Sequence, residues 1–172
     1  MDIPEKYKLK DGRFDYKKYY LYIDHMLKKY SNSNGLLVFG SEEGELNLVK
    51  IALKKGADIH ADDDEALRCA SQYGYFEIVK YLIDEGANIY AQNNWAWNWS
   101  SRNGHINIVK LLIKEGTNIH AQDDRAFKGA IKEGHLEVVK FLIESGANIH
   151  ADDDWALKYV RKYGHLSCEI FN

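Results

Sequence analysis

The sequence predicts an all-α solenoid of stacked helix-turn-helix units, and the first observation behind this prediction is a repeat. Glycine recurs every 30 residues in two series along the 172-residue chain. The first series is Gly44, Gly74, Gly104, Gly134 and Gly164, and the second is Gly56, Gly86, Gly116 and Gly146. Self-similarity at a fixed period of about 20 to 50 residues is typical of repeat architectures.

The second observation is the hydrophobic pattern between the glycines. The segments NLVKIALKKG, EIVKYLIDEG, NIVKLLIKEG and EVVKFLIESG carry apolar residues at positions i, i+1, i+4 and i+5, as in Ile78, Val79, Leu82 and Ile83. This spacing places the apolar side chains on one face of a helix. Each unit is therefore expected to form helix, turn, helix and loop. Helices of about ten residues are marginal alone, so neighbouring units must cover their apolar faces.

The helix ends are predicted from residue types with known preferences. Glycine just past a helix adopts positive φ at the lowest cost, so both series are expected to be C-terminal caps. An aspartate or asparagine precedes the first helix of each unit, and its side chain is expected to cap the N-terminus. These four residues are Asp64, Asn94, Asp124 and Asp154.

The two ends of the chain depart from the repeat. Residues 34–172 form an array of about five units, the first degenerate and the last truncated, whereas residues 1–33 lie outside it. Within 1–33, Tyr16, Tyr20, Ile23, Leu27 and Tyr30 follow helical spacing, which predicts one amphipathic helix over residues 14–30. Solenoids need covered ends, so this helix is expected to cap the first unit. The alternatives are a helix that docks on a partner and a self-association seam.

The truncated last unit carries a further expectation. The chain ends at residues 167–172, before a full second helix is complete. Apolar surface beside Tyr159, Val160 and Tyr163 is therefore expected to be open to self-association or early fraying.

Composition narrows the compartment and the partner. The formal charge of −3 and the pI of about 6.2 give no overall attraction to phosphate backbones, so nucleic acid is not the expected partner. Apolar runs such as residues 35–40 are far shorter than the roughly 20 residues that span a bilayer, and residues 1–6 lack a secretory signal. Cys69 and Cys168 lack the spacing of a disulfide framework, which predicts reduced thiols and an intracellular location.

The pattern A-x-x-G-H-x-x-I-V-K-x-L-I-x-x-G-A-N-I, seen at residues 101–119 and 131–149, resembles the ankyrin repeat. The loops differ from that family's usual repeat of about 33 residues, because about three residues and a Thr-Pro pair are missing. Shortened arrays of this kind are similar to ankyrin proteins of amoeba-infecting giant viruses. The resemblance implies a virus-encoded protein in the host cytoplasm that binds another protein, with the first helices and loop tips lining a concave binding side.

Residues that could carry chemistry have simpler structural interpretations. In the ankyrin family, the histidine that corresponds to His105, His135 and His165 forms a structural hydrogen bond between neighbouring units. His60, His120 and His150 share a loop position, but only the last two lie in adjacent units, which is too few for a metal site. The acidic runs lack an EF-hand pattern and are expected to serve turns.

Catalysis is not expected either. Neither cysteine has a base that the repeat would place beside it, and the chain contains no phosphate-binding loop or nucleophile elbow. The sequence therefore predicts no enzyme, no cofactor and no metal.

Variation between units points to a binding face. One side of the first helix, read at i, i+4 and i+7, is Glu65, Cys69 and Gln72 in one unit, whereas aromatic and basic residues cluster there in the next three units, with Gly129 among them. Trp97 shares its position with Leu67, Phe127 and Leu157 and is expected in the core. Interfaces are enriched in Trp, Tyr and Arg. The predicted partner-binding residues are Trp95, Trp99, Arg102, Arg125, Lys128, Lys132, Trp155, Lys158, Tyr159 and Lys162.

An alternative use of this face is a nucleic-acid or anionic phosphate site. It would employ the same basic residues together with Arg161. Steep loss of affinity with salt would distinguish it from a protein-binding face.

Overall fold

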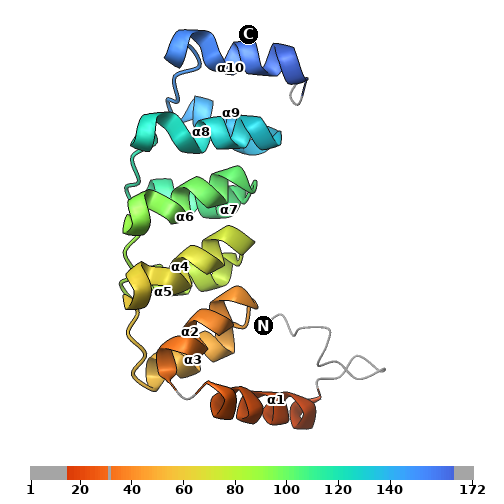
Figure 1. Ribbon diagram of the computed structural model, residues 1–172, viewed down its shortest axis with the longest axis vertical. Helices are drawn as coiled ribbons and strands as arrows, with labels where there is room; N and C mark the ends of the chain where they lie inside the picture. The colour runs from red at the N-terminus through yellow and green to blue at the C-terminus, as the bar shows by residue number, and fades with distance from the viewer. Residues whose placement is uncertain (1–14, 31, 165–172) are drawn as a thin grey trace.

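The computed structural model describes residues 15–30 and 32–164, and it confirms an all-α repeat solenoid. This part contains ten helices. They are α1 (Tyr16–Lys29), α2 (Ser33–Glu42), α3 (Leu46–Lys54), α4 (Ala61–Tyr73), α5 (Phe76–Asp84), α6 (Ala91–Arg102), α7 (Ile106–Lys114), α8 (Ala121–Glu133), α9 (Leu136–Glu144) and α10 (Ala151–Tyr163). Helix pairs from α2 onward stack in one direction, with α1 below them and α10 at the far end (Figure 1). None of the described helices combines the length and apolar character needed to cross a membrane.

The helices form two layers that share one core. The first helices pack in the order α2, α4, α6, α8 and α10, while α3, α5, α7 and α9 make a second layer. Equivalent valines of the second layer, Val49, Val79, Val109 and Val139, are all 0% exposed. Burial at the same position in each unit is what a repeated apolar face requires, so the helical pattern in the sequence is confirmed. Trp97 is also 0% exposed, as its position predicted.

The glycine prediction is confirmed by backbone geometry. All nine glycines of the two series have positive φ, between 65° and 106°. Gly74, Gly134 and Gly164 are themselves left-handed C-caps of α4, α8 and α10.

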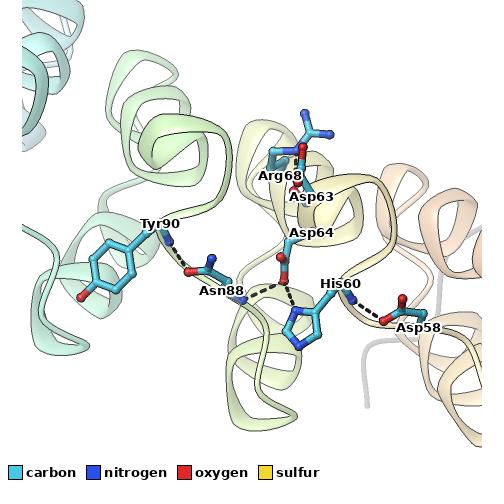
Figure 2. Close-up of polar contacts among 7 residues, drawn as sticks. All are labelled: Asp58, His60, Asp63, Asp64, Arg68, Asn88 and Tyr90. Atoms are coloured by element: carbon cyan, nitrogen blue, oxygen red, sulfur yellow. Dashed lines mark hydrogen bonds and ion pairs between the residues drawn. The ribbon is translucent and has the colours of Figure 1, made fainter.

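The prediction that Asp64 and its equivalents open the first helices agrees with the backbone, because the regular right-handed turns of α4, α6, α8 and α10 begin only after residues 64, 94, 124 and 154. The predicted side-chain cap is not found, since none of these four side chains accepts a hydrogen bond from an N–H of its own helix among the described residues. Asp64 is 3% exposed, and its carboxylate accepts a hydrogen bond from the backbone N–H of Asn88 in the next unit at 2.7 Å (Figure 2). The aspartate therefore joins two units.

The loops contain a feature that the sequence did not reveal. Residues 62–64, 92–94, 122–124 and 152–154 all have positive φ, so three consecutive left-handed residues interrupt the first turn of α4, α6, α8 and α10. Aspartate and asparagine tolerate this backbone better than most other non-glycine residues. In the α4 unit, the Arg68 guanidinium donates to the carbonyl oxygens of Asp62 at 3.0 Å and Asp63 at 3.1 Å.

An Asx turn comes before each left-handed segment. The backbone N–H of His60 donates to the Asp58 carboxylate at 2.9 Å, and that of Tyr90 donates to the Asn88 side chain at 3.0 Å (Figure 2). The same bond recurs at 2.9 to 3.0 Å from positions 120 and 150 to Asn118 and Asn148. Four equivalent turns fix the path of the shortened loops.

Helix α1 lies against the first unit through the C-terminal part of the predicted stripe. Ile23 is buried and Leu27 and Tyr30 are partly buried against the core. Met26 is also buried, whereas Tyr20 is 66% exposed. Tyr30 stacks on Phe39 of α2, with ring centroids 4.9 Å apart. These contacts favour a capping helix, but the division of the chain at residues 33 and 34 stays a prediction.

The end of the array is described only as far as Gly164. Val160 is buried in α10, whereas Tyr163 is 51% exposed. The segment at 167–172, on which the predicted truncation depends, lies outside the described residues, so self-association through this unit stays a prediction.

Candidate functional site

Side chains from α4, α6, α8 and α10 form one surface, called here the first-helix face. Trp95 and Trp99 stack on α6 with centroids 5.3 Å apart, and Trp155 and Tyr159 stack on α10 at 5.0 Å. All four side chains are half-buried. The sequence pattern grouped these residues, and the structure brings them together as two separate aromatic pairs.

Cations link the aromatic pairs to neighbouring units. The Arg68 guanidinium of α4 lies 5.5 Å from the Trp95 ring, and Lys132 Nζ of α8 lies 5.6 Å from the Trp155 ring. The Arg102 guanidinium lies 5.2 Å from the Trp99 ring in the same helix. Cations over indole rings are attracted by the ring quadrupole. These contacts connect the rings of α6 and α10 to the neighbouring units.

A cleft lies beside Trp99 of the α6 pair, and Lys132 connects it to the α10 pair. It has a volume of about 430 Å³ and lies between α6 and α8. Its lining residues include Trp99, Arg102, Arg125, Lys128, Gly129 and Lys132. The sequence placed five of these in the predicted site and set Gly129 on the same stripe. The sequence did not identify Asn98, Gln122 and Asp123, which also line the cleft. They do so because the start of α8 lies against α6, where the Asn98 amide donates to Gln122 Oε1 at 2.9 Å.

Part of the positive charge predicted for this face is neutralised within the array. Arg102 Nη2 lies 2.9 Å from Glu133 Oε1 of the next unit, and Lys128 pairs with Asp152 in the same way. Arg125 contacts only a neutral oxygen, that of Gln122 at 3.4 Å, among the hydrogen bonds of the described residues. Lys158 and Lys162 are exposed on α10, where Lys162 Nζ lies 5.0 Å from the Tyr163 ring.

The loop histidines are paired with aspartates four residues later. Nδ1 of His60, His120 and His150 lies 3.1, 2.7 and 2.7 Å from the carboxylates of Asp64, Asp124 and Asp154. Within residues 15–30 and 32–164, no three or more histidine, cysteine, aspartate or glutamate side chains converge as metal ligands would.

The histidine after the capping glycine joins two units in the case of His105. Its Nε2 lies 2.9 Å from the backbone carbonyl oxygen of Gln72 in the preceding unit. The equivalent His135 ring lies against Gly104, while position 165 is outside the described residues.

The surroundings of Cys69 favour the neutral thiol over the reactive thiolate. Burial, followed by the negative charges of Glu42 and Glu65, raises its pKa from 9.0 to about 11. The thiol Sγ lies 3.9 Å from the Glu42 carboxylate. Only the thiolate is nucleophilic, so raising the pKa lowers reactivity at neutral pH.

We therefore expect Cys69 to react with iodoacetamide at pH 8 about a hundredfold more slowly than a free cysteine, because the thiolate fraction falls tenfold per pKa unit. Digestion and mass spectrometry would follow Cys69 separately from Cys168, with the urea-unfolded chain as the reference. Equal rates in the folded and unfolded chains would contradict this expectation.

Stacked helix pairs with a continuous core and one variable face define a helical repeat scaffold. A family model described as ankyrin repeats in three copies matches residues 20–93 and 93–153. The chain belongs to the ankyrin-repeat family. Ankyrin repeats are generally protein–protein interaction modules and non-enzymatic scaffolds. No curated protein matches the chain.

Proposed function

We propose that this ankyrin array is a non-enzymatic module that binds an intracellular protein through the first-helix face of α6, α8 and α10. One observation carries the proposal: a basic cleft of about 430 Å³ is lined by Trp99 of one stacked aromatic pair and by Lys132, whose Nζ lies 5.6 Å from the Trp155 ring of the other. Half-buried aromatic rings beside arginine are the residue types that dominate binding energy at protein interfaces. The repeat core needs neither pair, since the same positions hold Glu65 and Cys69 in α4.

The predicted partner-binding residues differ in how freely they could contact a partner. Trp99, Arg125 and Lys132 line the cleft and have no carboxylate partner among the described residues. Lys128 is tied to the next loop, so its first role is between units. A host protein as the partner is supported only by the sequence resemblance to viral arrays.

The alternative, a nucleic-acid or anionic phosphate site, fits the charges less well. Two of its cations are paired with carboxylates, and Asp123 lines the same cleft. A polyanion gains affinity chiefly by displacing counterions with many free cations. Binding that falls steeply between low and physiological salt would favour this alternative.

Trp99→Ala tests the proposal. The partner is first captured from cells with the immobilised array and identified by mass spectrometry, and its affinity for purified variants is then measured. Loss of the Trp99 ring is expected to weaken binding by about 2 kcal/mol, roughly thirtyfold in Kd, with a smaller loss of folding stability. Unchanged affinity with a large loss of stability would show that the ring serves packing.

Phe141→Ala is the matched control for this substitution. Phe141 is half-buried on α9, in the second layer, and Lys110 Nζ lies 5.4 Å from its ring, much as Arg102 covers Trp99. The control should lower stability and leave affinity for the captured partner unchanged.

A further inference from the structure

One of the residues that line the cleft on the first-helix face has no side chain. Gly129 lies in the middle of α8, at the position that Trp99 and Tyr159 fill in the neighbouring units. A helical glycine costs about 1 kcal/mol relative to alanine. Gly129 therefore adds no side chain to the cleft that it lines.

Close packing explains part of this glycine but not the cleft. A Cβ at position 129 would lie 3.3 Å from the Cβ of Arg102, so the backbone of α8 approaches the stem of that arginine. The guanidinium of Arg102 points to Glu133 and the Trp99 ring. The stem of Arg102 therefore packs against Gly129, while its charged end pairs with Glu133.

Two cations border the cleft without a carboxylate to neutralise them. Arg125 and Lys132 lie four residues before and three residues after Gly129, on the same side of α8, and both line the cleft. Residues at these spacings share one helix face. In contrast, Arg102 and Lys128 are ion-paired with Glu133 and Asp152.

The charge that the cleft leaves unbalanced is small and local. Asp123 also lines it, so a chain of phosphates would meet a carboxylate beside the two free cations. Arg125 and Lys132 begin two turns apart, about 10 Å along α8, so their long side chains could turn from Gln122 and Trp155 toward a single carboxylate between them. Charge-assisted bonds to arginine and lysine are among the stronger polar contacts.

The aromatic pairs set the length of segment that could use all three places at once. Packed helices lie about 8 to 10 Å apart, so the pairs on α6 and α10 are about 16 to 20 Å apart. An extended chain advances about 3.3 Å per residue, so five or six residues cover that distance. An apolar side chain would then meet each aromatic pair.

We propose that the first-helix face binds an extended protein segment in which an aspartate or glutamate enters the cleft over Gly129, between Arg125 and Lys132, and apolar side chains about three residues to either side contact Trp95–Trp99 and Trp155–Tyr159. This inference rests on the proposed function, because it names the chemistry of the partner at the same face. The acidic residue supplies specificity, and the flanking apolar residues supply most of the buried area.

The test uses the full chain and synthetic heptapeptide mixtures of the form Φ-x-x-Z-x-x-Φ. Here Φ is Phe or Leu, x is any residue except Cys, Asp and Glu, and Z is Asp, Asn or phosphoserine in three separate mixtures. Fluorescence anisotropy measures binding at physiological salt, with a dodecathymidylate oligonucleotide as a fourth probe. The variants are Arg125→Gln with Lys132→Gln, and Lys80→Gln with Lys140→Gln as a charge-matched control on exposed positions of the second layer. Thermal unfolding checks both double variants.

The Asp mixture is expected to bind at least tenfold tighter than the Asn mixture, and this preference should vanish in the Arg125 and Lys132 variant but persist in the control. Equal binding of Asp and Asn, or a preference that survives the double substitution, would overturn the inference. Tighter binding of phosphoserine or of the oligonucleotide would also overturn it, since the cleft would then serve a phosphate.

A separate result would contradict the proposed function. If Trp99→Ala leaves the affinity of the captured protein partner unchanged, the face is not the binding site. If Trp99→Ala weakens that partner but the Asp preference is absent, the face binds protein and only its assignment to a carboxylate is wrong.

Discussion

Replacing Gly74 with alanine is expected to destabilise the array by about 3 kcal/mol, because two independent costs fall on the same atom. The residue has φ of +86°, in the left-handed region that costs an alanine about 1 to 2 kcal/mol. In addition, the new Cβ would lie 2.5 Å from the imidazole ring of His105 in the next unit. That ring cannot move freely, since its Nε2 is bonded to the Gln72 carbonyl oxygen. Urea unfolding would measure the loss.

Gly56→Ala separates the two costs. Its φ is +85°, almost the same, but a Cβ there would have nothing within 4 Å. This variant should therefore lose only the backbone term, about 1 to 2 kcal/mol. Adding His105→Ala to Gly74→Ala should remove the clash, so the double variant is expected to lose less than the sum of the single losses. Equal losses at both glycines would contradict the close-approach argument.

The same comparison shows why the repeat was predictable. A glycine required both by its φ and by the ring of the next unit cannot vary, so it recurs every 30 residues and marks the architecture. Trp97 was placed in the core for the same reason, since Leu67 and Phe127 occupy its position in adjacent units and are also buried. Positions under one steric demand look alike in every unit.

The side-chain caps predicted at the ends of the loops are not found, because two local backbone conformations favour the same residue types. Aspartate and asparagine are good N-caps, and they are also among the non-glycine residues that best tolerate positive φ. Asp64 satisfies the second demand, and its carboxylate reaches the Asn88 backbone rather than its own helix. Sequence preference alone could not choose between these uses.

The candidate site was predictable as a set of positions but not as a pattern of charges. Spacing within a helix showed that Trp95 and Trp99 share a face. Whether Arg102 meets Glu133 depends on how one unit is rotated against the next, which no spacing within a unit reveals. Fewer lysines and arginines of this face are therefore free of a carboxylate than their number in the sequence implied.

The tryptophans of α6 give the sharpest contrast between stability and recognition, and Trp97→Ala is expected to cost about 3 to 5 kcal/mol of unfolding free energy. Trp97 is 0% exposed and lies in the middle of the array, so its removal leaves a cavity between two units. Trp99→Ala, only two positions along, should cost clearly less because its ring is half-buried on the surface. Thermal and urea unfolding of the two variants would measure both losses.

Trp97→Phe is the companion variant, because it removes the indole N–H and creates a smaller cavity than alanine does. The Trp97 Nε1 is buried without a hydrogen-bond partner among the described residues, so phenylalanine removes an unpaired donor while keeping most of the ring. An unmade buried hydrogen bond costs about 1 to 3 kcal/mol, which offsets part of the volume lost. The phenylalanine variant should therefore lose less than half as much stability as the alanine variant. If Trp97→Ala and Trp99→Ala unfold alike, the stability of the middle units does not depend on the Trp97 ring, and the packing between α6 and its neighbours would need another origin.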